Sequence, residues 1–373
     1  MTSIFDGFDL NGLVLPNRIA MSAMTRTRAR EDGVPTNLMR DYYVQRASAG
    51  LIVTECTQVS DEAHGIIRCP GIHRDDQIAG WRKVTDAVHA AGGRIFCQIW
   101  HCGRVAHPDM RGGAAPVAPS PIPATGDFFL PSGRVDFPVP RELGINEISS
   151  IVADFAQATR NACTAGFDGV ELHGANGYLH DQFLQDGSNH RNDAYGGSAA
   201  NRARLMIETV AAMIEAWDAA HVGVRLSPSS FLYGVDDSDK RATFGHVIEQ
   251  LNALDVGYLC LLEPNAKDAE HGVQIEHVAA TFRRLISVPL MVNTGFDKAK
   301  GNAVIASGEA DLVAFGVPFL ANPDLPGRLR IDAPLNTPNP KLFYGEGAEG
   351  YTDYPGLTIP APSIANQALK GQL

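Results

Sequence analysis

The sequence of 373 residues has no long apolar run, few lysines and no pair of cysteines spaced as C-x-x-C. Its longest apolar stretches fall well short of the roughly 18 residues that a membrane-spanning helix needs, so we expect no such helix. The first ten residues carry two aspartates and no apolar segment, which disfavours a signal peptide. The six scattered cysteines are typical of reduced, structural thiols, so we expect a cytoplasmic protein.

Positive charge is also scarce. The chain has 31 lysines and arginines against 42 acidic residues, a net charge of −11, which disfavours binding to nucleic acid or to an anionic membrane. None of its lysines ends a predicted strand, which disfavours Schiff-base chemistry. H-E-x-x-H is absent, as is H-x-H after the first predicted strand, and we expect no metal ion.

Short apolar runs alternate with helical patterns along the chain. Several runs are continuously apolar, as in parallel strands that are covered on both faces. The predicted strands span residues 18–23, 51–55, 94–100, 169–173, 222–227, 257–263, 290–294 and 311–316. The predicted helices span residues 36–49, 78–91, 147–165, 199–219, 242–254, 276–286, 297–306 and 325–330. Eight alternating units predict an α/β fold, a (β/α)8 TIM barrel. The rival doubly wound sheet would have a G-x-G-x-x-G turn after a strand, and none occurs.

Two segments lie outside this repeat. Residues 102–146 are rich in proline and glycine and follow the third predicted strand, so we expect a capping insertion over the carboxyl end of the barrel. Residues 331–373 have a similar composition and are expected to form a tail that wraps the barrel. The remaining length is close to the roughly 250 residues of one barrel, so we predict a single domain over residues 1–373.

Polar side chains follow almost every predicted strand, which is where TIM barrels carry their chemistry. His173, Asn176 and Tyr178 stand close together after the fourth strand. The imidazole and the amide can both donate to one ligand oxygen, and the phenol can donate a proton. The alternative for each residue, taken singly, is a packed loop side chain with no chemical role.

Arg225 lies inside an apolar strand, where a buried charge needs a partner. That partner is either a cofactor that becomes anionic or a carboxylate such as Glu55. Gln98 and Thr25 also end strands and offer neutral hydrogen bonds to a polar ring.

The loops after the seventh and eighth strands lead directly into helices. Asn293, Gly295 and Phe296 lie in the first loop, and Gly316 and Val317 lie in the second. Backbone N–H groups at such positions can bind one phosphate, as they do in many TIM barrels. The alternative is that these glycines only form turns.

A set of motifs occurs together between about residues 4 and 357. They are Pro16-Asn17-Arg18, Met24-Thr25-Arg26, residues 42–52, Gln98-Ile99-Trp100-His101, residues 173–179, residues 181–184, Asn189-His190-Arg191, Tyr195-Gly196-Gly197-Ser198, residues 224–228, residues 321–325 and residues 350–355. With this combination the chain resembles the old yellow enzyme family of flavin-dependent ene-reductases, in particular its bacterial pentaerythritol tetranitrate and N-ethylmaleimide reductases.

The resemblance implies non-covalent FMN at the carboxyl end of the barrel. It implies that His173 and Asn176 hold a carbonyl or nitro oxygen of the substrate, while Tyr178 delivers the proton. The implied FMN contacts are Ala23, Met24, Thr25, Cys56, Gln98, Arg225, Asn293, Gly295, Phe296, Gly316 and Val317. The implied substrate contacts, besides the first three residues, are Trp100, Ile66 and Tyr351.

The implied activity takes hydride from NADPH or NADH and reduces activated C=C bonds of unsaturated ketones, aldehydes, maleimides or nitroalkenes in a ping-pong cycle. The alternative physiological substrates at the same site are nitrate esters, nitroaromatics and quinones. A barrel isomerase or binding protein that lacks FMN or binds it weakly is the alternative from another class. We expect a monomer or a homodimer. Arg134 and Arg141 could bind the 2′-phosphate of NADPH, or they could be mobile surface residues.

The chain departs from the family pattern at several positions. Val317 stands where the family usually has an arginine that contacts the FMN phosphate, so we expect weaker FMN retention. Cys56 and Ala23 replace the alanine and the proline that are common beside the flavin. Ile66 stands in place of a pocket tyrosine, so we expect a different substrate preference.

Overall fold

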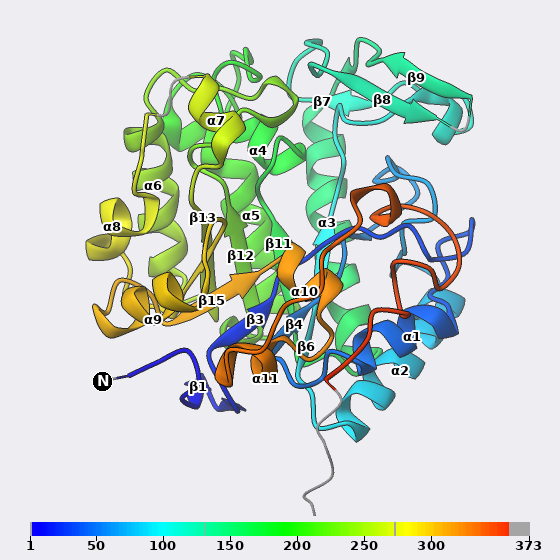
Figure 1. The fold of residues 1–373 in the computed structure, drawn as a ribbon. Helices are drawn as coiled ribbons and strands as arrows, with labels where there is room; N and C mark the ends of the chain where they lie inside the picture. The colour runs from blue at the N-terminus through cyan, green and yellow to red at the C-terminus, as the bar shows by residue number, and fades with distance from the viewer. Residues whose placement is uncertain (1, 131, 272–273, 358–373) are drawn as a thin grey trace, which may run out of the picture.

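The computed structural model describes residues 2–130, 132–271 and 274–357. Its main sheet consists of parallel strands, and the pairing of β6 with β11 closes that sheet into a barrel (Figure 1). The barrel strands are β3 (Ile19–Met21), β4 (Leu51–Val53), β6 (Ile95–Trp100), β11 (Gly169–His173), β12 (Val222–Leu226), β13 (Tyr258–Leu262), β14 (Leu290–Asn293) and β15 (Leu312–Phe315). The predicted (β/α)8 barrel is confirmed, with each strand inside its expected range.

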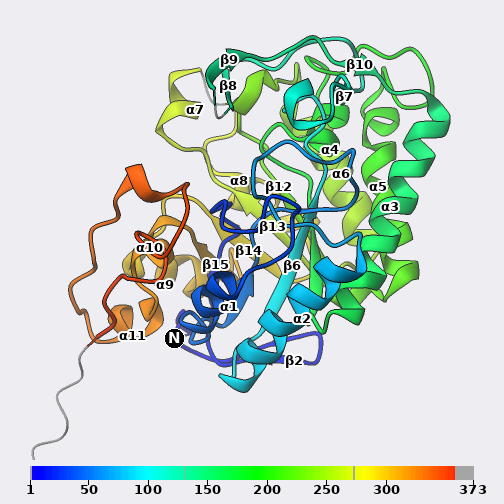
Figure 2. The same cartoon turned by 90° about the vertical axis from the view of Figure 1, so that its right-hand side faces the viewer.

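Helices surround the barrel, as Figures 1 and 2 show. The major ones are α1 (Asn37–Val44), α2 (Asp75–Ala90), α3 (Ile145–Thr164), α5 (Ala199–Ala216), α6 (Lys240–Ala253), α8 (Val278–Phe282), α9 (Lys298–Ala306) and α11 (Leu325–Arg330). Thr36 caps α1 as expected, because its side chain accepts a hydrogen bond from the Met39 N–H. Two short helices within the loops, α4 (Leu179–Leu184) and α7 (Ala266–Glu270), were not expected, whereas α10 (Val317–Ala321) is the helix into which the loop after the eighth strand leads. None of the helices that the structure describes is long and apolar enough to cross a bilayer.

Alternate residues of each strand point outward to the helices and inward to the barrel axis. The inward apolar side chains form a cluster of their own: Ala20, Leu51, Val53, Phe96, Tyr258, Cys260, Met291, Leu312 and Ala314. Leu10 and Leu15, from the hairpin of β1 (Phe8–Leu10) and β2 (Leu13–Leu15), join this cluster and cover the amino end of the barrel. The interior is therefore apolar at that end, and polar side chains lie toward the carboxyl end.

The insertion is locally folded. Its short strands β7 (Val117–Ala118) and β10 (Arg141–Glu142) pair with each other, while β8 (Asp127–Leu130) and β9 (Gly133–Asp136) form a hairpin. Figure 1 shows β7, β8 and β9 at the top of the molecule. Phe128 and Phe137 of the insertion belong to the same buried cluster as Trp100 and Tyr178. The expected cap is thus confirmed, and its apolar side packs over Trp100 at the end of β6 and over Tyr178 in the loop after β11.

The tail packs back onto the start of the barrel. The Arg26 guanidinium donates to the backbone oxygens of Gly350 at 2.6 Å and of Phe343 at 2.8 Å. Tyr351 stacks on Tyr42, with 4.0 Å between ring centroids. The predicted wrapping tail is confirmed as far as residue 357, while residues 358–373 of that prediction lie outside the described residues.

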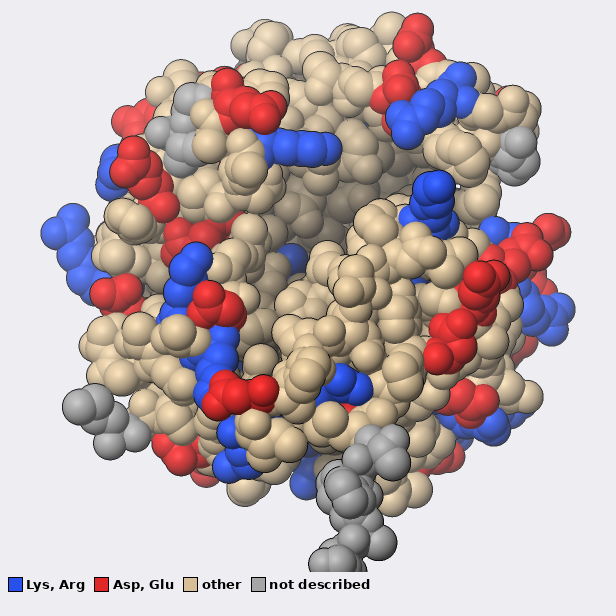
Figure 3. Space-filling model, in the orientation of Figure 1, with Lys and Arg blue, Asp and Glu red and all other residues tan. Residues whose placement is uncertain are grey.

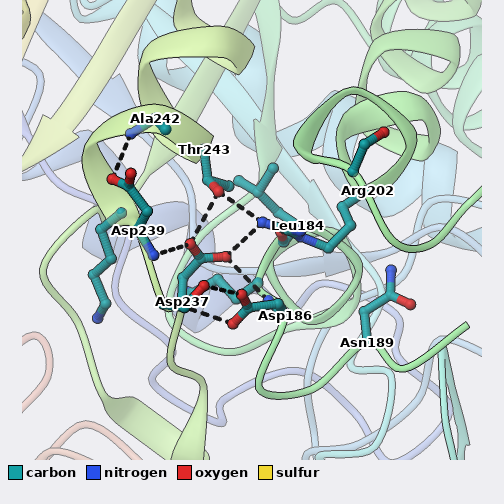
Figure 4. A network of polar contacts seen from close by, with 12 residues as sticks. Leu184, Asp186, Asn189, Arg202, Asp237, Asp239, Ala242 and Thr243 are labelled. Carbon is teal, nitrogen blue, oxygen red and sulfur yellow. Dashed lines mark hydrogen bonds and ion pairs between the residues drawn. The ribbon is translucent and has the colours of Figure 1, made fainter.

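A buried polar network ties the loop after β12 to helices α5 and α6 (Figure 4). Arg202 pairs with Asp237 at 2.9 Å and donates to Thr243 at 2.7 Å and to the Leu184 carbonyl at 2.8 Å. Asp237 also accepts from the Asp186 N–H at 3.0 Å. A buried charge is stable only with partners, so these contacts fix the course of the loop. The same loop carries Tyr233 to the carboxyl end of the barrel.

Candidate active site

The floor of the candidate site is the guanidinium of Arg225, which is only 6% exposed. It donates to Ser22 Oγ at 3.1 Å, to Asn293 Oδ1 at 3.0 Å and to Cys260 Sγ at 3.7 Å. It forms no ion pair with a carboxylate of the described residues. Glu55, the alternative partner, instead accepts from the Arg26 N–H at 3.1 Å. Arg225 is therefore a buried cation with only neutral hydrogen-bond partners, which suits an anionic ligand.

Gln98 and Cys56 lie side by side at one wall of the site. The Cys56 thiol donates to Gln98 Oε1 at 3.2 Å, and burial raises the pKa of that thiol to about 12, so it stays neutral. Ala23, Met24 and Thr25 follow β3 directly and are only partly buried. Their backbone and side chains are therefore accessible from the carboxyl end of the barrel, as a cofactor contact requires.

His173 ends β11 and is 4% exposed. Burial, and secondarily the charge of Arg225, lower the pKa of His173 well below its ordinary value, so the imidazole is neutral. Its Nδ1 atom is buried and has no hydrogen-bond partner among the described residues. An unpaired buried polar atom of this kind is costly unless a ligand satisfies it.

Asn176 sits in a left-handed backbone conformation with φ of 58°. Its N–H donates to Ser227 Oγ at 2.7 Å, and that hydroxyl in turn donates to Asp181 at 3.4 Å. Asp181 also accepts from the Gly177 N–H at 2.8 Å. Asparagine tolerates this conformation better than most residues, and the surrounding hydrogen bonds hold the turn that presents its side chain.

Tyr178 follows this turn and is 7% exposed. Its ring lies 4.9 Å from the His173 ring and 4.5 Å from that of Trp100, edge-on in both cases. Burial raises the pKa of Tyr178 well above its ordinary value, so the phenol keeps its proton at neutral pH. The structure thus brings together two of the predicted catalytic side chains, a neutral imidazole beside a protonated phenol, and Asn176 lies in the turn between them.

The two predicted phosphate loops also lie next to each other. Asn293 pairs with Ala314 in the parallel register of β14 and β15, which places the loop of Gly295 and Phe296 beside that of Gly316 and Val317. Gly295 has φ of 78° and open space around its Cα, so a ligand can approach the backbone there. Val317 begins α10 and is 45% exposed.

The prediction that Tyr351 contacts the substrate is wrong. It is fully buried and stacked on Tyr42 in the tail, where a substrate cannot reach it. Tyr344, seven residues earlier, is 65% exposed. Burial of its phenol raises the pKa of Tyr344, and the nearby Cys56 adds to the shift, so Tyr344 lies on the side of the site. Ile66 packs at the edge of the cluster that contains Trp100, and its contact with a substrate stays a prediction.

Two further site residues were missed in the sequence. Tyr233, from the loop after β12, has its ring 5.9 Å from that of Tyr178 and a left-handed φ of 60°. Glu171, in the middle of β11, is buried beside Gln98. The signal for Glu171 was a single carboxylate within an apolar strand, and no comparable signal marked Tyr233. Figure 3 shows a hollow in the molecular face between the cap and the loops around α10, with mostly uncharged walls.

These features fit a ligand with a polar ring and a phosphate. A buried unpaired cation and a carboxamide can bind the ring, and two adjacent loops with helix starts lie where such barrels bind phosphate. The loops offer open backbone, but position 317 carries a valine in place of the arginine that the resemblance implies.

Comparisons with known proteins agree with this arrangement. The family model described as "NADH:flavin oxidoreductase / NADH oxidase family" matches residues 3–336. 12-Oxophytodienoate reductase 1 of Oryza sativa subsp. japonica is 41% identical over 355 residues, which is 94% of this chain and 92% of the relative. Morphinone reductase is 42% identical with a TM-score of 0.90 over 95% of this chain and 96% of its own. The old yellow enzyme homologue from Zymomonas mobilis is 39% identical, with a TM-score of 0.92 over 95% of this chain and 100% of its own.

Fold and site together define a flavin-dependent oxidoreductase built on a TIM barrel. The chain belongs to the NADH:flavin oxidoreductase / NADH oxidase family, that of old yellow enzyme. FMN is its cofactor, and a nicotinamide coenzyme is its hydride donor. Morphinone reductase has been solved in complex with tetrahydroNAD.

Proposed function

We propose that the protein reduces activated C=C bonds of α,β-unsaturated ketones, aldehydes, maleimides and nitroalkenes with hydride from NADPH or NADH. The names of its relatives, 12-oxophytodienoate reductase and morphinone reductase, designate substrates with a ketone group, which supports this substrate class. We also propose a ping-pong cycle in which the nicotinamide and the alkene occupy the same place in turn, because His173, Asn176 and Tyr178 form a single set of substrate groups.

One observation carries the proposal. The neutral imidazole of His173 and the protonated phenol of Tyr178 lie just after one strand, with 4.9 Å between their ring centroids. A neutral imidazole can donate one hydrogen bond to a carbonyl oxygen without giving up its proton. A phenol with a raised pKa holds a proton for transfer at neutral pH. Reduction of a conjugated carbonyl needs both functions at once.

When bound, FMN would supply the hydride chemistry, and the side chains of this chain would orient the alkene and deliver the proton. His173 and Asn176 hold the carbonyl or nitro oxygen, and their hydrogen bonds strengthen as negative charge develops there. The Tyr178 hydroxyl delivers the proton to the α-carbon. Trp100 packs edge-on against Tyr178 and keeps its ring in place, while Ile66 and the exposed Tyr344 would border the bound substrate.

The ring of FMN would be held by Arg225, Gln98, Ala23, Met24, Thr25 and Cys56. The loops of Asn293, Gly295, Phe296, Gly316 and Val317 would hold its phosphate. We propose that residues 1–373 act as one FMN-binding domain, with residues 102–146 as its cap. The six unpaired cysteines support a reducing compartment such as the cytoplasm. The oligomeric state, monomer or homodimer, stays a prediction.

The coenzyme preference is not decided by the two arginines of the cap. Arg134 pairs with Asp127 at 2.9 Å and Arg141 pairs with Glu147 at 2.7 Å, both at the surface. Each would have to leave its partner to bind the 2′-phosphate of NADPH. Anaerobic reduction of the bound FMN with NADPH and with NADH, followed by absorbance, measures the preference directly.

Reduction of nitrate esters, nitroaromatics or quinones at the same site is the second candidate function. It is favoured by the paired donors of His173 and Asn176, which suit a nitro oxygen as well as a carbonyl oxygen. The deciding experiment is the oxidative half-reaction. FMN-loaded protein is first reduced and then mixed with 2-cyclohexenone, N-ethylmaleimide, a nitrate ester and a quinone in parallel. If the protein is an ene-reductase, we expect 2-cyclohexenone and N-ethylmaleimide to oxidise the reduced protein rapidly and to yield saturated products. Oxidation by the nitrate ester or the quinone alone would overturn the ene-reductase proposal.

A further inference from the structure

A buried carboxylate that the mechanism above does not use lies in the middle of β11. Glu171 is 1% exposed. Its Oε1 accepts from Gln98 Nε2 at 2.6 Å, and its Oε2 accepts from the Tyr258 hydroxyl at 2.8 Å. Both partners are neutral, and no cation of the described residues pairs with it. A buried carboxylate is costly, so its position directly beside a predicted FMN contact calls for an explanation.

The barrel is built to allow this arrangement. The parallel registers place Gln98, Glu171 and Gly223 at one level of β6, β11 and β12, and Gly223 pairs in turn with Tyr258 of β13. A Cβ atom on residue 223 would lie 2.3 Å from the Tyr258 ring. Glycine at this position therefore leaves the space through which the Tyr258 side chain passes β12 and reaches Glu171.

The contact with Glu171 fixes the orientation of the Gln98 carboxamide. An ionised carboxylate only accepts hydrogen bonds, so Gln98 must turn its Nε2 toward Glu171. Its Oε1 then faces the opposite side, where it accepts from the Cys56 thiol at 3.2 Å. A neutral carboxyl group could donate to Oε1 instead and allow the amide to turn. The charge on Glu171 thus decides which atom Gln98 presents to the polar edge of the FMN ring.

Glu171 also opposes the charge of Arg225. The groups that face it are Gln98 from β6, Arg225 from β12, and Tyr258 and Cys260 from β13. Burial raises the pKa of Glu171, and the charge of Arg225 acts in the opposite direction. Burial, and secondarily the charge of Glu171, raise the pKa of Tyr258 and of Cys260, so both stay neutral. Arg225 is then the one cation within this set of groups, and Glu171 the one anion.

We propose that Glu171 is a positioning residue that locks the Gln98 amide and partly offsets the charge of Arg225, and thereby sets the reduction potential of bound FMN. Reduction of FMN by hydride adds negative charge to its ring. A nearby carboxylate opposes that change, while Arg225 favours it. The inference rests on the assignment of Gln98 and Arg225 to FMN. It does not depend on which alkene or nitro compound is the substrate.

The test uses Glu171→Gln, which keeps the size of the side chain and removes the charge. We expect the midpoint potential of bound FMN to become more positive at pH 7. A tenfold gain in affinity for reduced over oxidised FMN corresponds to about 30 mV for a two-electron couple. We also expect the visible spectrum of bound FMN to shift, because the Gln98 amide is released. The readouts are the spectroelectrochemical potential and the absorption spectrum, neither of which needs substrate.

Asp237→Asn is the matched control. It removes a different buried carboxylate, one that contacts neither Gln98 nor Arg225, so we expect a lower thermal unfolding midpoint and an unchanged potential. If Glu171→Gln changes thermal stability but leaves the potential and the spectrum at wild-type values, Glu171 is only a structural residue and the proposal is overturned.

Tyr258→Phe keeps the proposal testable if Glu171→Gln does not fold. This variant removes one donor from Glu171 and so raises the pKa of the carboxyl group. We expect a positive shift of the potential that is larger at low pH than at high pH. If the midpoint potential of the variant equals that of the wild type at both low and high pH, the proposal is overturned. Shifted potentials in a protein that reduces no alkene would leave this inference standing and refute the ene-reductase function alone.

Discussion

The imidazole of His173 lies edge-on to the phenol of Tyr178, with 4.9 Å between the ring centroids and 70° between the planes. Both groups are buried and neutral, the imidazole because burial lowers its pKa and the phenol because burial raises its pKa. His173 can therefore donate a hydrogen bond to a substrate oxygen, and Tyr178 can donate a proton to a substrate carbon. Neither side chain has to change its charge beforehand. The backbone holds this pair through the turn at Asn176 and Gly177.

Tyr178→Phe should separate the two half-reactions. Loss of the phenolic proton should slow alkene reduction by about 10²- to 10⁴-fold, the usual contribution of a positioned general acid. Reduction of FMN by NADPH needs no proton from Tyr178 and should stay within a few-fold of wild type. Stopped-flow absorbance measures both rates in the same preparation. Equal losses in the two half-reactions would contradict the role of Tyr178 as proton donor.

Glu55 should make stability fall as pH rises. Burial raises the pKa of this carboxyl group to about 7, although contacts from Arg26 oppose the shift. The folded protein thus holds a proton between about pH 4.5 and pH 7 that the unfolded chain releases. The contribution to stability is present below pH 4.5 and is lost as pH rises through 7. At about 1.4 kcal/mol per pKa unit, the loss is about 3 kcal/mol.

The measurement compares wild type with Glu55→Gln in urea at pH 5 and at pH 8. Glutamine cannot ionise, so the variant should gain in unfolding free energy relative to wild type as pH rises. Any effect of the substitution on packing is the same at both pH values and cancels in this comparison. A constant difference between the two proteins would show that Glu55 does not titrate in this range.

The Arg202–Asp237 pair should matter far more to stability than a surface pair. Asp237→Ala leaves the Arg202 guanidinium buried without its anion, and breaking a buried pair in this way costs about 3–5 kcal/mol. The matched variant Asp127→Ala breaks an exposed pair with Arg134 and should cost about 1 kcal/mol or less. Urea unfolding followed by circular dichroism gives both values. Similar losses for the two variants would mean that the network in Figure 4 adds little.

The barrel could be predicted because its signal is local and repeated. Each strand is buried on both faces, so it appears in the sequence as an apolar run, and β11 begins and ends where the pattern predicted. The cap hairpin of β8 and β9 lacked such a signal, because its strands are short and half exposed. Sequence could therefore place the cap but not describe its fold.

Site residues at the end of a strand could be predicted from the sequence. Site residues that depend on a contact with a distant part of the chain were harder to predict. His173 and Arg225 could be placed from the strand pattern alone. Tyr344 and Tyr351 lie in one glycine-rich tail without periodicity, and nothing local shows which of them faces the site. The role of Glu171 depends on Tyr258 passing over Gly223 from two strands away. Such a contact depends on the closed barrel, which the local pattern does not describe.

Val317→Arg should tighten FMN binding. Val317 is 45% exposed at the start of α10, so a longer side chain can be accommodated there without disturbing the core. An arginine would add a charge-assisted contact to the phosphate, which at an exposed position is worth about 1 kcal/mol, or a Kd lower by roughly fivefold. Quenching of FMN fluorescence on titration into apoprotein measures the Kd. The gain should shrink as salt is added, because the new contact is an exposed ion pair. Val317→Gln controls for side-chain length, and an arginine variant that binds no better than this control would show that the phosphate lies elsewhere.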